Sequence, residues 1–360
     1  MGENELTDEE LDRYSRQISL NYIGYKGQSL LKAGRVCLAG IGGLGSSIAL
    51  KIVAMGIGYL RIIDRDVVSK SDLHRQYLYD ESHIGVPKVE AAKERLNKLN
   101  SSVKVDAIAS SINSSNIEEL IDGVDLVIDG LDTVGSRYIL NRAAMKLKVP
   151  YIFGAAIQTY GNISTFIPEE TACLECFYSG LRDEDMERCA IVGVFTPLLD
   201  IISSIEVSEA VRILMNKEPY LKNRLMFVDL ENVCFDIVEL TRNVNCPTCG
   251  EVRGKTFRQP EKAVSGICGR DGKGVFIIDT QVKALNIGVL RKKLQAEGIA
   301  LKTEGTMGLT FNYNKELNVS VLKGGVVILQ VAPSSRIFDE KVALSKYRNI
   351  AKRLDLPMVQ

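Results

Sequence analysis

Four cysteines of this 360-residue sequence form two C-x-x-C pairs, Cys173 with Cys176 and Cys246 with Cys249. Two such pairs supply four thiolates, the number that a closed tetrahedral zinc site requires. A redox-active pair is the alternative, but neither pair begins a helix after a strand, as thioredoxin-like motifs do. The spacing therefore predicts a structural Zn²⁺ ion that ties together two distant segments of the chain.

Another cysteine, Cys189, lies between the two pairs in the segment "MERCAIVGVFTPLLD" and is not needed for the zinc site. It is either a nucleophile for covalent catalysis or a passive loop residue. Cys37 and Cys234 lie in apolar strand patterns and are predicted to be core residues. Cys268 is near a predicted linker, and the sequence assigns it no role.

A glycine-rich turn follows the first predicted strand. Gly40, Gly42 and Gly45 form G-x-G-x-x-G between that strand and a helix. Such glycines let the backbone approach a phosphate, to which the helix N-terminus offers N–H groups and partial positive charge. Asp64, at the end of the next strand, is placed to bind a ribose hydroxyl. Alone, the motif predicts an adenosine nucleotide, and an NAD or FAD enzyme is the simplest alternative.

Charged residues beyond the second strand favour a triphosphate. The segment "SKSDLHRQYLYDESHIGVPK" contains Arg75, Gln76 and Lys88. Two cations fixed beside a phosphate-binding turn suit ATP and the charge that develops during phosphoryl or nucleotidyl transfer. Asp132, in "DGLDTVGSR", follows a strand, where it could hold Mg²⁺ on the phosphates and also cap the next helix, since the two roles are compatible. The pattern predicts ATP and Mg²⁺ as ligands.

The elements that position these residues alternate between strand and helix, which predicts an α/β fold. We expect a Rossmann-like, doubly wound, mostly parallel sheet with added antiparallel strands. A helix over residues 8–20, capped by Thr7 or Asp8, precedes it. Further strands are predicted at 103–110, 125–130, 150–156, 161–168, 224–230 and 233–240, and helices at 87–100, 114–121, 134–147 and 196–215.

After Cys249 the composition becomes polar and basic. We interpret residues 1–250 as one domain, 251–262 as a linker and 263–360 as a smaller α+β domain. The second unit is predicted to contain a strand at 275–279, a helix at 287–297, two or three strands to about 332 and a helix at 339–353. It does not resemble a rhodanese, and docking of a partner is the role we expect for it.

Composition excludes several classes of protein. The 45 basic residues balance 45 acidic ones, which argues against a nucleic-acid partner. No apolar run of about 18 residues predicts a membrane span, and the N-terminus has no signal-peptide pattern. We therefore expect a cytoplasmic protein, in which paired cysteines favour metal binding over disulfides. Only two histidines, His74 and His83, are present, so few residues are available for a mechanism with histidine as the general base.

Taken together, seven motifs resemble the ThiF/MoeB-type adenylyltransferases, which are homologous to ubiquitin-activating enzymes. They are "RYSRQI", "GIGGLGS", "IIDRDVVSKSDLHRQ", "IGVPKVEAAKERL", "LVIDGLDT", "GAAIQTYGNISTF" and the two cysteine pairs, in that order over residues 6–250. The resemblance implies that ATP adenylates the C-terminal glycine of a ubiquitin-like protein ending in Gly-Gly. It also implies a homodimer, because Arg16 looks like the family's arginine that crosses into the partner subunit's site.

The resemblance also implies roles for single residues. Asp72 and Thr133 depart from the family pattern, which has asparagine at both positions, and an acid repels a triphosphate unless a metal lies between them. The implied catalytic residues are Arg16, Arg75, Lys88, Asp132 and Cys189. The implied ATP-binding residues are Gly40, Gly42, Gly43, Gly45, Asp64, Asp66, Asp72, Arg75, Gln76, Lys88, Asp132 and Thr133.

Three outcomes of adenylation are open at this stage. The main prediction is a thioester between the activated protein and Cys189, followed by transfer to a ubiquitin-conjugating enzyme. The alternative is adenylation of a sulfur carrier protein for molybdopterin, thiamine or tRNA thiolation. A second alternative is a non-catalytic nucleotide-binding scaffold.

Overall fold

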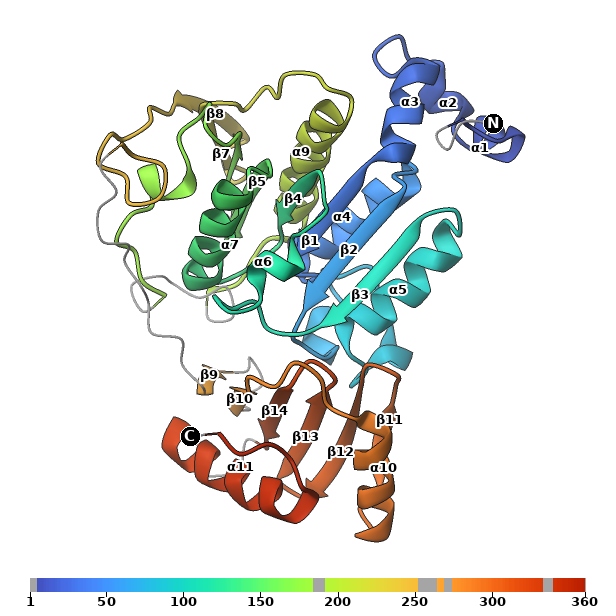
Figure 1. The fold of residues 1–360 in the computed structure, drawn as a ribbon, viewed down its shortest axis with the longest axis vertical. Helices are drawn as coiled ribbons and strands as arrows, with labels where there is room; N and C mark the ends of the chain where they lie inside the picture. Colours follow the sequence, from blue (N-terminus) through green and yellow to red (C-terminus); the bar gives the residue numbers. More distant parts are fainter. Residues whose placement is uncertain (1–4, 184–191, 252–263, 269–273, 333–338, 360) are drawn as a thin grey trace.

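The chain folds into two β-sheets, and helices pack against each of them (Figure 1). The computed structural model describes residues 5–183, 192–251, 264–268, 274–332 and 339–359. The first sheet has eight strands and the second has six. This arrangement agrees with the predicted Rossmann-like sheet followed by a smaller α+β unit.

The first sheet has the strand order β3-β2-β1-β4-β5-β6-β7-β8. Strands β1 to β5 run parallel, and β6, β7 and β8 are added in antiparallel orientation. The order reverses direction between β1 and β4, the place where open α/β sheets bind ligands. The strands are Arg35–Ala39 (β1), Tyr59–Asp64 (β2), Lys104–Ala109 (β3), Leu126–Asp129 (β4), Tyr151–Ile157 (β5), Tyr160–Phe166 (β6), Arg224–Asp229 (β7) and Cys234–Glu239 (β8).

Helices cover both faces of this sheet. Successive side chains of a strand point to opposite faces, and in these strands both sets are apolar. In β1, Val36 and Leu38 belong to one buried cluster and Cys37 and Ala39 to another. The first cluster also holds residues of α4 (Gly43–Ala54), α5 (Lys88–Leu99) and α9 (Thr196–Leu214), and the second those of α6 (Ile117–Leu120) and α7 (Val134–Leu147). The sheet is therefore buried on both faces, as its continuous apolar strands predict.

The N-terminal segment differs from the single helix predicted over residues 8–20. It forms α1 (Asp8–Arg13) and α2 (Ser15–Ile18), followed by α3 (Gly24–Ala33). The break falls at Tyr14, whose ring is buried and whose hydroxyl accepts a hydrogen bond from Asn100 Nδ2 at 2.8 Å. The anchoring of this side chain outweighs local helix propensity. The predicted cap at Thr7 is confirmed, since its hydroxyl accepts from the Glu10 amide.

Strand β8 forms the last edge of the first sheet, and all six of its residues are exposed. The prediction that Cys234 is a core residue is therefore wrong, while Cys37 is buried as predicted. The apolar pattern of β8 resembles that of a buried strand, so the sequence could not show that both of its faces lie open.

The second sheet is antiparallel, with the order β11-β12-β13-β14-β10-β9. Four strands precede residue 332 after the helix, rather than the predicted two or three, and β9 was not predicted. Strand β9 escaped prediction because its sequence, "VSGIC", is short and only weakly apolar. The elements are β9 (Val264–Cys268), β10 (Gly274–Asp279), α10 (Ile287–Ala296), β11 (Leu301–Glu304), β12 (Gly308–Asn314), β13 (Leu317–Leu322), β14 (Val326–Val331) and α11 (Glu340–Leu354).

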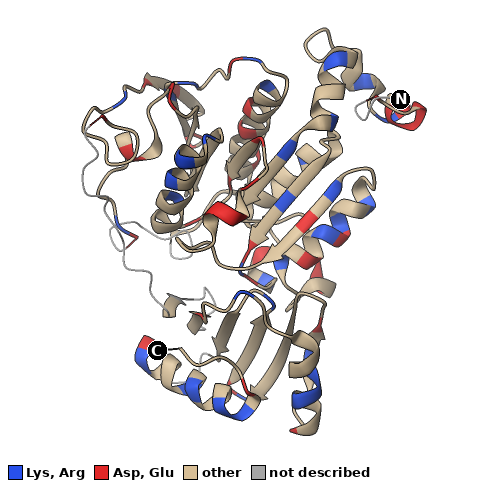
Figure 2. Cartoon of the chain, viewed as in Figure 1, with Lys and Arg blue, Asp and Glu red and all other residues tan. Residues whose placement is uncertain are grey.

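The second unit packs below the ends of β2 and β3 (Figure 1). Ile328 and Leu322 of its sheet share a buried cluster with Val67 of the first unit. Basic and acidic residues, blue and red in Figure 2, are interspersed along both units, in keeping with the balanced composition. Within the described ranges, we find no helix that is both long and apolar enough to cross a membrane.

Candidate functional site

The glycine turn connects β1 to α4 at the carboxyl ends of the parallel strands. Gly40 has φ +88°, and a Cβ atom there would lie 2.5 Å from the carbonyl oxygen of Gly130. A Cβ atom at Gly45 would lie 2.0 Å from the carbonyl oxygen of Gly40. These positions therefore require glycine, because the turn touches both its own helix and the end of β4.

The N-terminus of α4 is open to a ligand. Gly42 is its N-cap residue and Gly43 its first residue, and among the described residues no side chain caps this end. Of the residues that the structure describes, only Gln76, through Nε2 at 4.0 Å, would lie within 4 Å of a Cβ atom at Gly42. The first amide groups of α4 are thus available to bind a phosphate, as the sequence predicts.

Asp64 ends β2 beside this turn. Its carboxylate accepts hydrogen bonds from the amides of Ile41 at 2.8 Å and Asp66 at 2.7 Å. Burial, and secondarily the charge of Asp66, raises the pKa of Asp64 to about 6, against the opposing effect of Lys88. The carboxylate therefore lies at the ribose position of a Rossmann-like turn, with a pKa close to the physiological range.

Lys88, the first residue of α5, is buried between two acids. Its Nζ lies 3.2 Å from Asp66 Oδ2 and 3.8 Å from Asp72 Oδ2. Burial alone would lower the pKa of Lys88, but the charges of Asp66 and Asp72 raise it above its ordinary value. The ammonium group is therefore held charged at the edge of the predicted nucleotide site.

Asp72 forms hydrogen bonds with polar groups of the segment that follows β2. This segment includes two 3₁₀ turns, η1 (Lys70–Asp72) and η2 (Glu81–His83). Asp72 is buried, and its carboxylate accepts from Arg75 Nη2 at 3.2 Å and Gln76 Nε2 at 2.9 Å. Burial would raise the pKa of Asp72, but Lys88 and further hydrogen bonds hold it below the usual value. Asp72 thus orders the cations, and its contact with the nucleotide stays a prediction.

The same segment folds over the glycine turn. The buried hydroxyl of Tyr79 donates to the carbonyl of Ile41 at 2.9 Å, and Gln76 lies next to Gly42. Among the described residues, the Oε1 atom of Gln76 is buried without a hydrogen-bond partner. A polar atom in this position suits a ligand that donates a hydrogen bond beside the turn.

Asp132 and Thr133 follow β4 on the other side of the glycine turn. The Gly130 amide donates to the carbonyl of Ala39 at 2.7 Å, which holds the two loops together. Asp132 is exposed, so its carboxylate is accessible to a metal ion. Thr133 is the N-cap residue of α7, but its side chain makes no capping hydrogen bond. Asp132 is therefore not the N-cap residue of α7, so the second role considered for it is wrong.

Asp183, which the sequence did not single out, caps α7. Its carboxylate accepts from the amides of Val134 at 2.6 Å and Gly135 at 3.3 Å. Asp183 therefore ties the segment that leads towards Cys189 to the loop that carries Asp132. No sequence pattern predicts this contact, because the partners are far apart along the chain. Cys189 itself lies outside the described residues.

A buried ion pair supports the loop of Asp132. Arg137 Nε lies 3.2 Å from Asp129 Oδ2, and Arg137 Nη2 donates to the carbonyls of Leu131 at 2.6 Å and Gly154 at 2.9 Å. Burial raises the pKa of Asp129, although Arg137 opposes the shift. Sequence reasoning missed both residues, although a charged residue inside the apolar strand "LVID" was a usable signal.

Arg16 lies far from the glycine turn of its own chain. It is exposed on α2, and the neighbouring Gln17 donates to the carbonyl of Met55 at 3.0 Å. Met55 ends α4, whereas the glycine turn begins it. A helix of this length spans about 18 Å, so Arg16 is at the wrong end of α4 to reach nucleotide in its own subunit.

The four predicted zinc ligands come together. The Sγ atoms of Cys173, Cys176, Cys246 and Cys249 all lie within 4.8 Å of one another. Cys173 Sγ is 3.6 Å from Cys246 Sγ, and Cys176 Sγ is 3.4 Å from Cys249 Sγ. Tetrahedral Zn²⁺ with bonds of about 2.3 Å needs S···S separations of roughly 3.8 Å. The cluster therefore fits Zn²⁺ in number, chemistry and spacing.

Neighbouring groups hold the sulfur atoms in place. The amides of Cys173 and Asn243 each donate to Cys176 Sγ at 3.5 Å, and Asn141 Nδ2 donates to Cys173 Sγ at 3.6 Å. Glu175, in the 3₁₀ turn η3 (Leu174–Cys176), pairs with Arg142 of α7 at 2.6 Å. Such donors favour thiolates and orient metal ligands.

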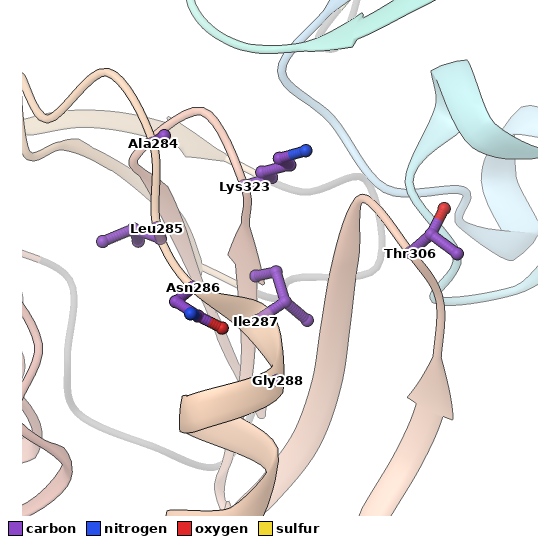
Figure 3. A pocket seen from close by; sticks show the side chains of 7 residues that line it. All are labelled: Ala284, Leu285, Asn286, Ile287, Gly288, Thr306 and Lys323. Atoms are coloured by element: carbon purple, nitrogen blue, oxygen red, sulfur yellow. The ribbon is translucent and has the colours of Figure 1, made fainter.

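The pocket in Figure 3 is separate from the predicted nucleotide site. It lies in the second unit and contains none of the predicted ATP-binding residues. Its walls are formed by Ala284, Leu285, Asn286, Ile287, Gly288, Thr306 and Lys323.

The raised pKa of Asp64 predicts that ATP binding depends on pH. A ribose hydroxyl donates best to the ionised carboxylate, so affinity should fall as the pH drops below about 6, by up to about tenfold per pH unit. Since the unfolded pKa is about 3.9, ionised Asp64 also lowers folding stability above pH 6, and this cost disappears towards pH 4. Calorimetric titration with ATP at several pH values tests this.

Asp64→Asn is the matched variant. ATP itself titrates in the same way with both proteins, so the difference between wild type and variant isolates the contribution of Asp64. The variant should lose the part of the pH dependence that belongs to the protein. An unchanged pH profile in Asp64→Asn would assign the dependence to another group.

Comparison with known proteins agrees with this geometry. The profile of the family described as "ThiF family" matches residues 14–248. Over 248 residues the chain is 35% identical to a molybdopterin-synthase adenylyltransferase of Salmonella typhimurium, covering 69% of this chain and 99% of that one. A sulfur carrier protein adenylyltransferase of Thermus thermophilus is 36% identical over 251 residues, covering 68% and 93% of the two chains.

A third relative and a solved structure extend the comparison. The SAMP-activating enzyme E1 of Haloferax volcanii is 33% identical over 243 residues, which cover 67% of this chain and 90% of that one. The crystal structure of E. coli MccB with ATP has the same fold, with a TM-score of 0.60 and 22% identity, and covers 69% of this chain and 77% of that one. The profile match spans more than half of the sequence and includes the glycine turn, both cations, Asp132 and three of the four clustered cysteines, Cys173, Cys176 and Cys246. The chain therefore belongs to the ThiF family.

Proposed function

We propose that this protein uses ATP and Mg²⁺ to adenylate the C-terminal glycine of a ubiquitin-like sulfur carrier protein. The observation that carries the proposal is the grouping of three features where the strand order reverses. An uncapped helix N-terminus, the charged Lys88–Asp72–Arg75 group and the exposed Asp132 surround the same edge of the sheet. The name of the Thermus thermophilus relative, a sulfur carrier protein adenylyltransferase, supports a sulfur carrier as the substrate.

The reaction needs positioning and charge more than a general base. The C-terminal carboxylate of the carrier is already a nucleophile; its oxygen bonds to the α-phosphorus of ATP, and the bond from that phosphorus to the bridging oxygen breaks. Pyrophosphate leaves with the electron pair of that bond. Lys88 and Arg75 would stabilise the charge on the phosphates. Asp132 would hold Mg²⁺, which supplies further neutralisation of that charge when bound.

Carrier-dependent exchange of pyrophosphate into ATP tests the proposal. Wild-type protein should exchange only when it is given a sulfur carrier ending in Gly-Gly that is encoded in the same genome. A carrier without its last glycine should give no exchange, and Asp132→Ala should be inactive while it remains folded. ATP binding without exchange, with any such carrier, would favour the non-catalytic scaffold.

Arg16 supports a homodimer as the active form. Its neighbour Gln17 contacts Met55 at the far end of α4, a helix about 18 Å long, so Arg16 is expected to assist nucleotide transfer in another subunit. We therefore propose that two subunits exchange Arg16 side chains between their active sites.

Mixed dimers test the exchange of Arg16. Arg16→Ala and Lys88→Ala should each be nearly inactive alone, but unfolding and refolding them together should restore exchange activity. One site of the mixed dimer has both of its defects, and the other has neither. With equal mixing, half of the dimers are mixed and each has one intact site, so about a quarter of the wild-type activity should return. No recovery, with mixed dimers demonstrated by tagged subunits, would place Arg16 outside the partner's site.

The fate of the acyl-adenylate separates the two enzymatic outcomes. The relatives favour the sulfur-carrier alternative over the main prediction of a thioester on Cys189 with transfer to a conjugating enzyme. In either outcome adenylation does not use the thiol. Cys189→Ala should therefore leave pyrophosphate exchange within about twofold of wild type.

The thioester itself is tested on non-reducing gels. A reductant-sensitive adduct between carrier and wild type that disappears in Cys189→Ala would support covalent catalysis by that cysteine. Absence of an adduct in the wild type would leave adenylation as the whole reaction. Loss of pyrophosphate exchange in a folded Cys189→Ala protein would contradict both outcomes.

A further inference from the structure

Two turns of the second sheet contact the first unit. One contacts the segment that carries Lys88, and the other contacts the end of β3. One, residues 305–307, connects β11 to β12, and the other, residues 323–325, connects β13 to β14. We call them the bracing turns. Figure 3 shows one side chain from each, Thr306 and Lys323, on the rim of the same pocket.

The first bracing turn binds Glu90 in the first turn of α5. One carboxylate oxygen accepts from the amide of Thr306 at 2.6 Å and from its hydroxyl at 2.9 Å, and the other accepts from the Met307 amide at 3.0 Å. A Cβ atom at Gly305 would lie 2.2 Å from Glu90 Oε2. Three donors on one carboxylate make a specific, directional contact between the two units.

The carbonyl of Gly85 provides a second contact just before α5. It accepts hydrogen bonds from the hydroxyls of Thr303 at 3.0 Å and Thr310 at 2.8 Å. Gly85 has φ +91°, and a Cβ atom there would lie 2.7 Å from Thr303 Oγ1. The chain leading into α5 is therefore held by hydroxyl groups of two neighbouring strands.

The second bracing turn contacts the end of β3. The amide of Gly324 donates to the carbonyl of Ala109 at 3.1 Å, and a Cβ atom at Gly324 would lie 2.2 Å from that oxygen. Val326 and Ile328, next to this turn, belong to the same buried cluster as Val67. Apolar burial therefore reinforces the polar contacts, and the interface fixes one arrangement of the two units.

Lys88 lies between the two braced residues, Gly85 and Glu90. Its own amide donates to the carbonyl of Asp66 at 2.9 Å, so its backbone is also tied to the loop after β2. A shift of this short segment would move Nζ relative to Asp66 and to the phosphate-binding turn. The second unit thus holds in place a residue on which the nucleotide site depends.

We propose that the second unit is a positioning element for Lys88 and so sets the affinity of the enzyme for ATP. The inference rests on the proposed function of Lys88 as a phosphate-binding residue. It assigns a role to a unit that lies beyond the part of the chain matched by the ThiF family. Glu90 and Gly324 are its positioning residues, and neither contacts the predicted nucleotide site.

Two variants of the full-length protein weaken the contacts of the bracing turns in different ways. Glu90→Ala removes the acceptor of three hydrogen bonds, and Gly324→Val forces a side chain against the carbonyl of Ala109. Each should raise KM for ATP by between about 10-fold and 100-fold, while KM for the carrier stays within about twofold. Amide hydrogen exchange in peptides that cover residues 85–90 should accelerate in both.

The control is Lys283→Ala, which breaks an ion pair with Glu119 across the same interface. Both side chains of this pair are largely exposed, at 80% and 73%. Loss of the pair should therefore change neither KM for ATP nor amide hydrogen exchange in residues 85–90. Unchanged ATP affinity and unchanged amide exchange in both Glu90→Ala and Gly324→Val would overturn the proposal. Accelerated amide exchange with unchanged ATP affinity would also overturn it.

The experiment separates failure of this inference from failure of the proposed function. If wild type catalyses no carrier-dependent exchange, the proposed function fails, and direct titration with ATP replaces KM as the readout. A weaker Kd for ATP in the two variants than in Lys283→Ala would then still support the positioning role. An active wild type with two unaffected variants would reject the positioning role alone.

Discussion

Replacing Lys88 with alanine is expected to lower kcat/KM for ATP by about 10²- to 10³-fold, the usual effect of removing a preorganised electrostatic group. The ammonium group is buried and faces Asp66 and Asp72. Without it, two carboxylates of the site lose their nearest shared cation, and they then repel the incoming triphosphate. We therefore expect both a higher KM and a lower kcat in pyrophosphate exchange.

Lys98→Ala is the matched control for this prediction. Lys98 lies on the same helix, but it is exposed, and its one ion pair within the described part of the chain is with Glu94 one turn away. Its loss should leave exchange unchanged. Thermal unfolding of both variants should be measured in parallel, because removing Lys88 also leaves the buried Asp72 with fewer partners. Near-wild-type kcat/KM in Lys88→Ala would contradict the assigned role.

Cys246→Ser is expected to release the zinc ion and destabilise the first unit. The metal would join the segment after β6 to the segment after β8, so its loss resembles the loss of a cross-link, at a cost of about 3 kcal/mol. For a unit of this size, Tm should fall by roughly 6–12 °C. Elemental analysis should give one zinc per chain for wild type and none for the variant.

Cys37→Ser and Cys234→Ser serve as controls for the zinc prediction. Cys234 is exposed and Cys37 is buried in the core, and neither is part of the four-cysteine cluster. Both variants should retain one zinc per chain, although Cys37→Ser should lose some stability from placing a hydroxyl in an apolar core. Wild-type protein that contains no zinc when purified without chelators would contradict the assignment.

The local chemistry of the site could be predicted from sequence because its residues lie in short motifs. Gly40 and Gly45 belong to one turn, and each C-x-x-C pair belongs to one loop. The parallel sheet then brings the ends of its strands to one edge, which places Asp132 beside the glycine turn. For these residues, spacing within a motif and the order of the motifs were sufficient.

Contacts between distant segments could not be predicted in this way. Asp183 caps α7, and Glu90 holds the first bracing turn, but no periodicity or motif connects these partners. Asp72 was identified as a departure from the family pattern, yet its role in ordering Arg75 and Gln76 emerged only from the folded arrangement. Cys234 was misassigned because an apolar strand at an exposed edge has the same pattern as one inside the sheet.

Intact-mass spectrometry of the carrier protein tests the central claim most directly. The carrier should be incubated with the enzyme, MgATP and a pyrophosphatase that removes the released pyrophosphate. The account predicts that the carrier gains the mass of one adenylyl group, located at its C-terminal glycine by fragmentation, and that Asp132→Ala forms none. A carrier that stays unmodified while ATP is consumed, or that gains a phosphoryl group in place of an adenylyl group, would contradict the account.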